Sequence, residues 1–254
     1  MSGDEDIRRI AAELESGGIS CKIYVGSDLS SPDERIEVLT TEEARRFECS
    51  GVLAAMIFNP EPQRRELIPV KRDGEFAKGS VPMTKECVRH ESIIRLRLRE
   101  GDTLYDVGDG TGSVAIEAAS LHPGLTVFTV ERNPEAAALI RQNADAAGAG
   151  NVTVVEGEAP DALQKLPKPD AVFIGGSGGR LKEIAEAVSR KGSGIRYVIN
   201  AVSLETVLEV RDLALKNGAE DVEAVQLSVS GMVAAGSHHM LRAQNPVFII
   251  SFRL

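Results

Sequence analysis

The residues with the clearest chemical potential form a glycine-rich run that is followed by an acidic residue. The run DVGDGTG (106–112) stands between a predicted strand at 103–107 and the helical stretch SVAIEAASL. Glycines at such a turn let the backbone approach a ligand closely. About 20 residues further on, Glu131 ends the predicted strand TVFTV, where a carboxylate can accept hydrogen bonds from ribose hydroxyls. Together they predict one nucleoside site, and the alternative is a tight turn beside a solvated Glu131.

The same loop bears on which nucleoside cofactor is bound. NAD sites follow the pattern G-x-G-x-x-G, and Ser113 stands here where the third glycine is required. Asp106 and Asp109 place two carboxylates beside the loop, where a pyrophosphate would be repelled but a cationic sulfonium and an α-ammonium group would be tolerated. Charge therefore favours S-adenosylmethionine over a nicotinamide cofactor, although Asp109 could instead weaken the site.

Two further segments could close over the nucleoside. The run GEAP (157–160) follows a predicted strand at 152–155, and Glu158 could accept a hydrogen bond from the exocyclic amine of adenine. The alternative is a helix start with Pro160 in its first turn, and both can hold together. Thr84, in MTKECVRH, could cap a helix that runs to about residue 97 or close over the methionine end of the cofactor.

Candidate substrate contacts follow the later strands. The run GGSGG (175–179) lies at the carboxyl edge of the predicted sheet, where it could admit a bulky planar ligand or form a flexible crossover. Asn200 ends a strand at the same edge and could orient substrate or cap the next helix. His238, His239 and Arg242 stand between the last two predicted strands, where they could bind substrate carboxylates or lie solvated in a hairpin loop.

The composition narrows the class of substrate. The chain has 254 residues, of which 43% are hydrophobic and 26% charged, as in ordinary soluble globular proteins. A net charge of -9 disfavours attraction to nucleic acid phosphates. Trp is absent and aromatic residues make up 4% of the chain, so platforms for base stacking would be hard to assemble. We therefore expect a small-molecule substrate and neither a nucleic acid nor a membrane partner.

Metal sites, disulfides and export are not indicated. Cys21, Cys49 and Cys87 are odd in number and contain no close-set pair, and no His, Cys and carboxylate spacing suits a metal. The start MSGDEDIRRI lacks the basic and apolar regions of a secretory signal. No apolar run approaches the roughly 18 residues needed to span a bilayer. We expect a cytoplasmic protein with reduced thiols and no bound metal.

Domain organisation follows from a proline-rich segment. Residues 60–82 contain four prolines and many charges without a sustained apolar period, which is typical of a linker. Residues 1–59 form a partial α/β segment, with a helix near 4–16, strands at 21–25 and 52–58, and the helix TEEARRF between them. So small a unit seldom buries enough apolar surface to be stable alone, so we expect it to pack on the main domain or on another subunit.

Residues 83–254 alternate short apolar runs with helical stretches, the pattern of a parallel sheet wrapped by helices. Strands are predicted at 103–107, 125–130, 152–155, 171–175, 195–200, 222–229 and 246–252. The last two have no helical pattern between them and should pair antiparallel. The fold class is therefore α/β, with the seven-stranded mixed sheet of the Rossmann-like class I methyltransferases.

Several motifs together resemble one family. DVGDGTGSVAIEAA, ERNPEAAALIRQNA, GEAPDAL, FIGGSGG, NAVSLET and HHMLRAQNPVFII, within residues 82–254, are similar to the CbiT family, the decarboxylating C15 methyltransferases of corrin (cobalamin) biosynthesis. The segment IYVGSDLSSPDERIEVLTTEEARRF is similar to the tail of the CbiE family of C5 methyltransferases, whose body is missing here. The departures are Asp109, and Glu158 where the CbiT family usually has Asp.

The CbiT resemblance implies cofactor contacts at Thr84, at the loop from Gly108 to Gly112, at Glu131 and at Ala159. The complete predicted set of S-adenosylmethionine contacts is Thr84, Gly108, Asp109, Gly110, Thr111, Gly112, Glu131, Arg132, Glu158, Ala159 and Gly175. The predicted substrate contacts are Gly176, Gly178, Asn200, His239 and Arg242. Arg180 and Lys182 are further candidate partners for substrate carboxylates, and no residue is assigned as a general base or as the cause of decarboxylation.

The resemblance also implies a reaction and an assembly. The expected reaction methylates C15 of a precorrin, of the cobalt-precorrin-6B or the precorrin-6Y type, with loss of carbon dioxide from the C12 acetate. A homotetramer is expected, and a separate C5-methyltransferase is a candidate partner. Three alternatives remain at this point: a methyltransferase that acts on another acceptor, a non-enzymatic scaffold of the corrin pathway whose cofactor loop is idle, and an NAD-dependent oxidoreductase.

Overall fold

The computed structural model describes residues 4–16, 18–49, 53–60, 70–108 and 110–254. The chain divides into two compact units, Met1–Glu66 and Leu67–Leu254. None of the helices within the described ranges is long and apolar enough to cross a membrane.

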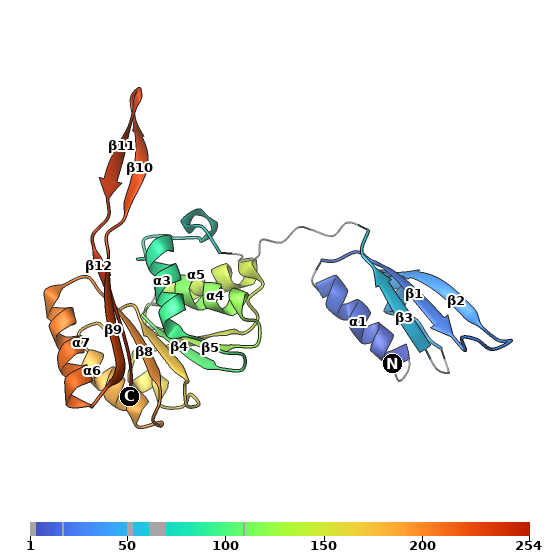
Figure 1. Cartoon of the computed structure of the whole chain (residues 1–254), viewed down its shortest axis with the longest axis horizontal. Helices are drawn as coiled ribbons and strands as arrows, with labels where there is room; N and C mark the ends of the chain where they lie inside the picture. Colours follow the sequence, from blue (N-terminus) through green and yellow to red (C-terminus); the bar gives the residue numbers. More distant parts are fainter. Residues whose placement is uncertain (1–3, 17, 50–52, 61–69, 109) are drawn as a thin grey trace. The chain divides into compact units, whose positions relative to one another are not determined.

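The first unit is a three-stranded antiparallel sheet with helices packed on one face (Figure 1). Its elements are α1 (Asp4–Ser16), β1 (Lys22–Ser27), β2 (Arg35–Thr40), α2 (Thr41–Ala44) and β3 (Leu53–Phe58). The strand order is β2-β1-β3, and Ile23 and Val25 of β1 share a small core with Ile7 and Ala11 of α1. Strand β2 was not predicted from the sequence, because a short edge strand with charged residues between its apolar ones carries a weak signal.

The opposite face of this sheet is apolar and exposed. Tyr24 of β1 pairs in register with Val38 of β2 and Met56 of β3. Because successive residues of a strand point to opposite faces, these three side chains lie opposite the buried Ile23. The outer sheet face, as we call it, consists of Tyr24, Ile36, Val38, Met56 and Phe58. All of them except Tyr24 are more than half exposed.

The second unit is built on a seven-stranded mixed sheet of order β6-β5-β4-β7-β8-β12-β9. The strands are β4 (Thr103–Val107), β5 (Thr126–Glu131), β6 (Val152–Glu156), β7 (Ala171–Ile174), β8 (Arg196–Ala201), β9 (Glu220–Leu227) and β12 (Val247–Arg253). The first five are parallel, and β12 runs antiparallel to both β8 and β9. The predicted seven-stranded mixed sheet is thus confirmed. The chain order reverses between β4 and β7, which is where open α/β sheets bind ligands.

Helices cover both faces of this sheet (Figure 1). On one face lie α3 (Glu86–Leu96), α4 (Ser113–Leu121) and α5 (Pro134–Ala147), and on the other lie α6 (Leu181–Ser189) and α7 (Leu204–Lys216). Strand residues divide between the two cores by alternation: Leu104 faces the first and Tyr105 the second. The sheet is therefore buried on both faces, and only its edges and strand ends can form a site.

A two-stranded hairpin projects from the second unit beyond β9 and β12 (Figure 1). It consists of β10 (Ser230–Ala235) and β11 (His238–Ala243), paired antiparallel in a sheet of their own. The sequence allowed His238, His239 and Arg242 to lie in a hairpin loop. The structure corrects this, because all three lie on strand β11, where they are exposed. This hairpin could not be predicted from the sequence. Neither of its faces packs on the core, so its strands lack the alternation of apolar and polar residues that identifies a strand.

Residues 70–82, which the sequence assigned to a linker, belong to the second unit. They include a single 3-10 turn, Asp73–Glu75, and Phe76 is 5% exposed within the core that also contains α3 and α4. The side chain of Asp73 accepts a hydrogen bond from the first N–H of α3, at Glu86, over 2.9 Å. Side-chain contacts rather than regular structure hold this segment, which is why no apolar period marks it.

Candidate functional site

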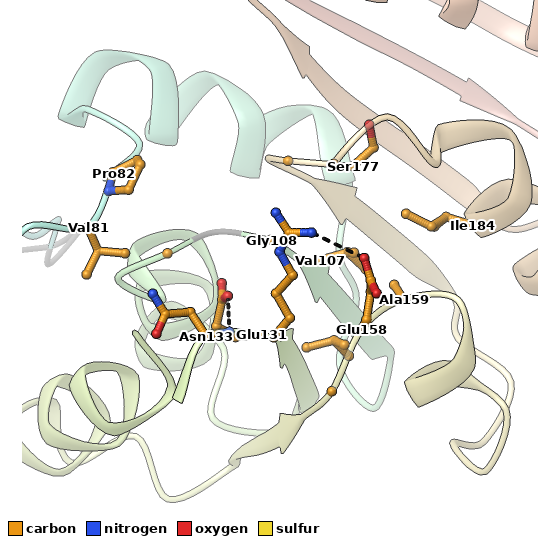
Figure 2. A pocket seen from close by; sticks show the side chains of 16 residues that line it. Val81, Pro82, Val107, Gly108, Glu131, Asn133, Glu158, Ala159, Ser177 and Ile184 are labelled. Atoms are coloured by element: carbon orange, nitrogen blue, oxygen red, sulfur yellow. Dashed lines mark hydrogen bonds and ion pairs between the residues drawn. The ribbon is translucent and has the colours of Figure 1, made fainter. Parts of the chain in front are cut away.

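A cavity of about 290 Å³ opens at the carboxyl ends of β4, β5, β6 and β7 (Figure 2). It is lined by Val81, Pro82, Val107, Gly108, Gly110, Val130, Glu131, Arg132, Asn133, Gly157, Glu158, Ala159, Gly176, Ser177, Gly178 and Ile184. Val81 and Pro82 face Ser177 and Ile184 across it, and Glu131 and Glu158 lie on its floor between them (Figure 2). The cavity thus lies beside the point where the strand order reverses.

At two positions of the loop after β4, other backbone segments come so close that only glycine fits. Gly108 has a φ of 71°, and a Cβ built on it would lie 2.1 Å from the carbonyl oxygen of Gly176. Gly110 has a φ of 69°, and its Cβ would lie 2.4 Å from the carbonyl oxygen of Pro82. Any larger residue would push back one of these segments. The loop therefore lies between two other backbone segments and presents its own backbone to the cavity.

Asp106, near the end of β4, stabilises this turn through a hydrogen bond to helix α4. Its carboxylate is fully buried and Oδ2 accepts a hydrogen bond from the N–H of Ala115, 2.9 Å away, in the first turn of α4. A carboxylate at a helix N-terminus interacts favourably with the helix dipole. Asp106 thus fixes where α4 begins. Asp109, the other predicted carboxylate of the loop, lies outside the described residues.

Glu131 ends β5 and reaches the cavity with a fixed orientation. Its side chain is 9% exposed, and Oε1 accepts a hydrogen bond from the N–H of Asn133 at 2.8 Å. Asn133 in turn caps α5, because its Oδ1 accepts from the N–H of Glu135 at 2.9 Å and Pro134 follows in the first turn. The contact to Asn133 uses one carboxylate oxygen of Glu131, so the other can receive hydroxyl donors from a ligand.

Glu158 and Ala159 form the part of the wall that follows β6. The carboxylate of Glu158 lies 3.2 Å from Nη1 of Arg132 and 3.7 Å from Nη1 of Arg180. Half-exposed ion pairs of this kind contribute little stability, so Glu158 can exchange a partner when a ligand enters. The run continues into a 3-10 turn, Asp161–Leu163, that begins after Pro160. The predicted helix start is therefore a single short turn.

Of the predicted cofactor contacts that the structure describes, four lie outside the cavity lining. Thr84 does not cap α3, since the cap is Lys85, and the carbonyl oxygen of Thr84 accepts from Arg89 at 2.8 Å. Gly112 caps α4, and Gly175 donates its N–H to Val107. The hydroxyl of Thr111 is buried and has no hydrogen-bond partner among the described residues. These residues support the loops around the cavity.

The predicted substrate contacts divide into two groups. Gly176 and Gly178 line the cavity, beside Ser177. Asn200 is near Ser92 of α3, with 3.1 Å between Oδ1 and Oγ, and it does not cap α7, because Ser203 accepts the hydrogen bond from Thr206. His239 and Arg242 lie on the projecting hairpin and do not line the cavity of their own chain.

Eight lining residues were not among the predicted contacts: Val81, Pro82, Val107, Val130, Asn133, Gly157, Ser177 and Ile184. Asn133 carried a usable signal, because Asn followed by Pro is a common start of a helix and places the cap next to Glu131. Val81 and Pro82 carried none, since they stand in a stretch without periodicity. Over the described residues, no cluster of three or more His, Cys, Asp or Glu side chains is arranged to hold a metal ion.

Comparisons with known proteins cover this whole site. A family model described as precorrin methyltransferase domain matches residues 75–253, a range that includes every residue lining the cavity. The chain is similar to the cobalt-precorrin-6B C(15)-methyltransferase (decarboxylating) of Salmonella typhi, with 39% identity over 182 residues, 71% of this chain and 94% of that protein.

A second relative and a solved structure agree with this. The chain is similar to the precorrin-6Y C(5,15)-methyltransferase (decarboxylating) of a Sinorhizobium species, with 37% identity over 209 residues, 79% of this chain and 50% of that protein. It also resembles the crystal structure of precorrin-6Y C5,15-methyltransferase from Geobacter metallireducens GS-15, with a TM-score of 0.68 and 39% identity over 72% of this chain and 97% of that chain.

Proposed function

The chain belongs to the precorrin methyltransferase domain family, and from this we propose that it transfers a methyl group from S-adenosylmethionine to C15 of a precorrin with loss of the C12 acetate carboxyl as carbon dioxide. The similarity to a C(15)-methyltransferase of Salmonella typhi supports this choice of carbon and the decarboxylation. The observation that carries the proposal is the cavity between the glycine loop and Glu131, within the matched range.

The residues of the cavity fit an adenosyl cofactor. Gly108 and Gly110 line the cavity with backbone alone, at positions where a Cβ would collide with neighbouring carbonyl oxygens, and Glu131 offers an oriented carboxylate to the two ribose hydroxyls. Ala159 and Ile184 are apolar lining residues that suit the faces of an adenine ring. The carboxylate of Glu131 is compatible with a cation and unfavourable for a pyrophosphate, whereas that of Glu158 is paired with Arg132.

Positioning is the main task of the chain in this reaction. S-adenosylmethionine supplies an electrophilic methyl group on a sulfonium centre. The chain holds its two reactants in line and keeps water away, because the electron-rich meso carbon of the macrocycle is itself the nucleophile. The conjugated ring takes up the electron pair left by the departing carboxylate, so the proposal requires no strong general base. Gly176 and Gly178 line the side of the cavity at which we place the flat macrocycle.

An activity assay tests the proposal. The chain is incubated with S-adenosylmethionine labelled in its methyl group and, in parallel, with precorrin-6B or precorrin-6Y type substrates, with and without cobalt, and with unrelated acceptors. We expect label in the tetrapyrrole together with one carbon dioxide per methyl group. Labelling only of the unrelated acceptors would contradict the substrate, and no labelling at all would favour an idle scaffold.

The projecting hairpin supports assembly of several copies of this chain. Met232, Met240 and Leu241 are 70%, 59% and 75% exposed on a two-stranded ribbon, which is marginally stable without a partner. A homotetramer held together through these hairpins buries those side chains. His239 and Arg242 remain substrate contacts in this proposal, supplied by the arm of a neighbouring copy.

The first unit suits a different partner. The relative from Sinorhizobium acts, by its name, at C5 as well as C15, and half of its length is not matched by this chain. The segment that resembles the tail of C5 methyltransferases forms the first unit here, and its outer sheet face is apolar and exposed. A separate C5-methyltransferase is the partner that this face binds in our proposal, since it would restore the two activities to one complex.

A further inference from the structure

One wall of the cavity is a segment with little regular structure. Residues 71–84, which we call the strap, contain one 3-10 turn and contribute Val81 and Pro82 to the lining. The strap passes so close to the glycine loop that Gly110 has no room for a Cβ beside Pro82. The distance between strap and loop sets the width of the cavity at this point, and a side chain that fixes it would control cofactor binding.

Asn143, on helix α5, joins the strap to the loop. Its Oδ1 accepts a hydrogen bond from the N–H of Ala77 at 2.8 Å. Its Nδ2 donates to the carbonyl oxygen of Ala77 at 3.0 Å and to that of Thr111 at 3.0 Å. The side chain is 5% exposed, and both amide protons are used. Ala77 belongs to the strap and Thr111 to the glycine loop.

Only an amide of this length can make all three contacts. A carboxylate would keep the bond from the N–H of Ala77 but would face two carbonyl oxygens without a proton to offer. An alanine would leave the part-buried backbone groups of Ala77 and the buried carbonyl of Thr111 without this partner. Asn143 is not among the residues that line the cavity, so its effect on a ligand must pass through the two backbone segments.

The ends of the strap are held separately. The guanidinium of Arg89 donates to the carbonyl oxygens of Lys71 and Thr84, at the two ends of the strap. The ring of Phe76 lies 4.9 Å from its central carbon. Loss of Asn143 would therefore free the part of the strap after Phe76, which includes Val81 and Pro82, while Phe76 and both ends stay attached, which leaves a folded but looser wall.

We propose that Asn143 is a positioning residue for cofactor binding, which acts by locking the strap against the glycine loop. The inference rests on the proposed function, because it takes S-adenosylmethionine as the ligand of the cavity. A strap that is free to move must be ordered when the ligand binds, and that ordering reduces affinity. The motif ERNPEAAALIRQNA thus carries two functional residues, Glu131 at its start and Asn143 near its end.

A matched pair of variants separates positioning from folding. Asn151 is a second amide whose side chain donates to backbone carbonyl oxygens, those of Ala119, His122 and Leu125. It lies at the amino ends of the parallel strands, away from the cavity at their carboxyl ends. Asn143→Ala and Asn151→Ala are each titrated calorimetrically with S-adenosylhomocysteine, and the Tm of each is measured without ligand. We expect both variants to lower Tm, and only Asn143→Ala to raise the Kd, by about tenfold.

Each outcome has a distinct meaning. Equal Kd values in both variants and the wild type would overturn the inference and leave the proposed function standing. A wild-type chain that binds no S-adenosylhomocysteine would overturn the proposed function itself. If Asn143→Ala does not fold, hydrogen exchange of the wild-type chain provides the test: the ligand should slow exchange of peptides from residues 71–84, and unchanged exchange there would contradict the inference.

Discussion

The guanidinium of Arg89 and the carboxylate of Glu117 form an ion pair in the interior of the second unit, with 2.5 Å between Nε and Oε2 and both side chains fully buried. Arg89 stands on α3 and Glu117 on α4, and Asp73 of the strap lies 3.1 Å from the same guanidinium. The buried guanidinium of Arg89 thus joins α3, α4 and the strap. Its role in the site is indirect, because it holds the ends of the wall that Val81 and Pro82 form.

Removal of one partner should destabilise the chain strongly. Glu117→Ala leaves a buried guanidinium with less compensation, and we expect a loss of about 3 to 5 kcal/mol in the free energy of unfolding. Urea denaturation measures this. The control is Glu186→Ala, which breaks an exposed pair with Lys182 and should change the free energy by less than about 0.5 kcal/mol. Similar values for the two variants would show that the buried pair is not a structural anchor.

A methyl group at Gly110 should push the strap away from the glycine loop and distort the cavity. Gly110→Ala forces its Cβ to within 2.4 Å of the carbonyl oxygen of Pro82 and places alanine at a φ of 69°. We expect at least tenfold weaker binding of S-adenosylhomocysteine, or about 1.4 kcal/mol, in a calorimetric titration. Gly150→Ala serves as the control, because its Cβ would meet nothing within 4 Å. Unchanged affinity in Gly110→Ala would mean that the cofactor does not depend on this wall.

A charge on the projecting hairpin should break the homotetramer that we propose. Leu241→Glu places a carboxylate where we expect apolar contact between copies, and light scattering after gel filtration should show a fall from the mass of a tetramer toward that of a monomer. Leu215→Glu is matched to it, since Leu215 on α7 is 72% exposed and lies outside the arm. An unchanged mass for Leu241→Glu would remove the hairpin from the interface.

The outer sheet face should be needed for binding a C5-methyltransferase. We expect the wild-type chain to form a complex with such a protein in sedimentation velocity, and Met56→Glu to lose it. Leu208→Glu, at an exposed position of α7 in the second unit, should retain the complex. Self-association of the wild type that Met56→Glu abolishes would instead assign the face to a second copy of this chain, and an unaffected complex would exclude the face altogether.

The sheet and the edge that bears the cavity could be predicted because they rest on local patterns. Parallel strands bring their carboxyl ends to one edge, so a glycine loop after one strand and Glu131 at the end of the next had to meet there. Alternation of buried runs and helices was enough for the seven strands. The antiparallel partner at the edge followed from the absence of a helix before Val247–Arg253.

The remaining parts of the site depend on contacts between distant residues. Asn143 acts through Ala77, which lies 66 positions earlier, and no period or motif in a single sequence connects them. The strap has the composition of a linker. It is held by buried side chains such as Arg89 and not by a regular hydrogen-bond ladder, so no periodic pattern marks it. The hairpin arm has no face toward the core, so the pattern that identifies strands is missing there.

Titration of S-adenosylhomocysteine into the wild-type chain and into Glu131→Ala tests the central claim most directly. Glu131 is oriented by Asn133 and is the carboxylate to which we assign the ribose hydroxyls. We predict that the wild type binds one ligand per chain and that Glu131→Ala weakens binding by about 1 to 3 kcal/mol. Glu135→Ala, at an exposed position in the first turn of α5, should leave the affinity unchanged. Equal affinity of Glu131→Ala and the wild type would contradict the placement of the cofactor in this cavity.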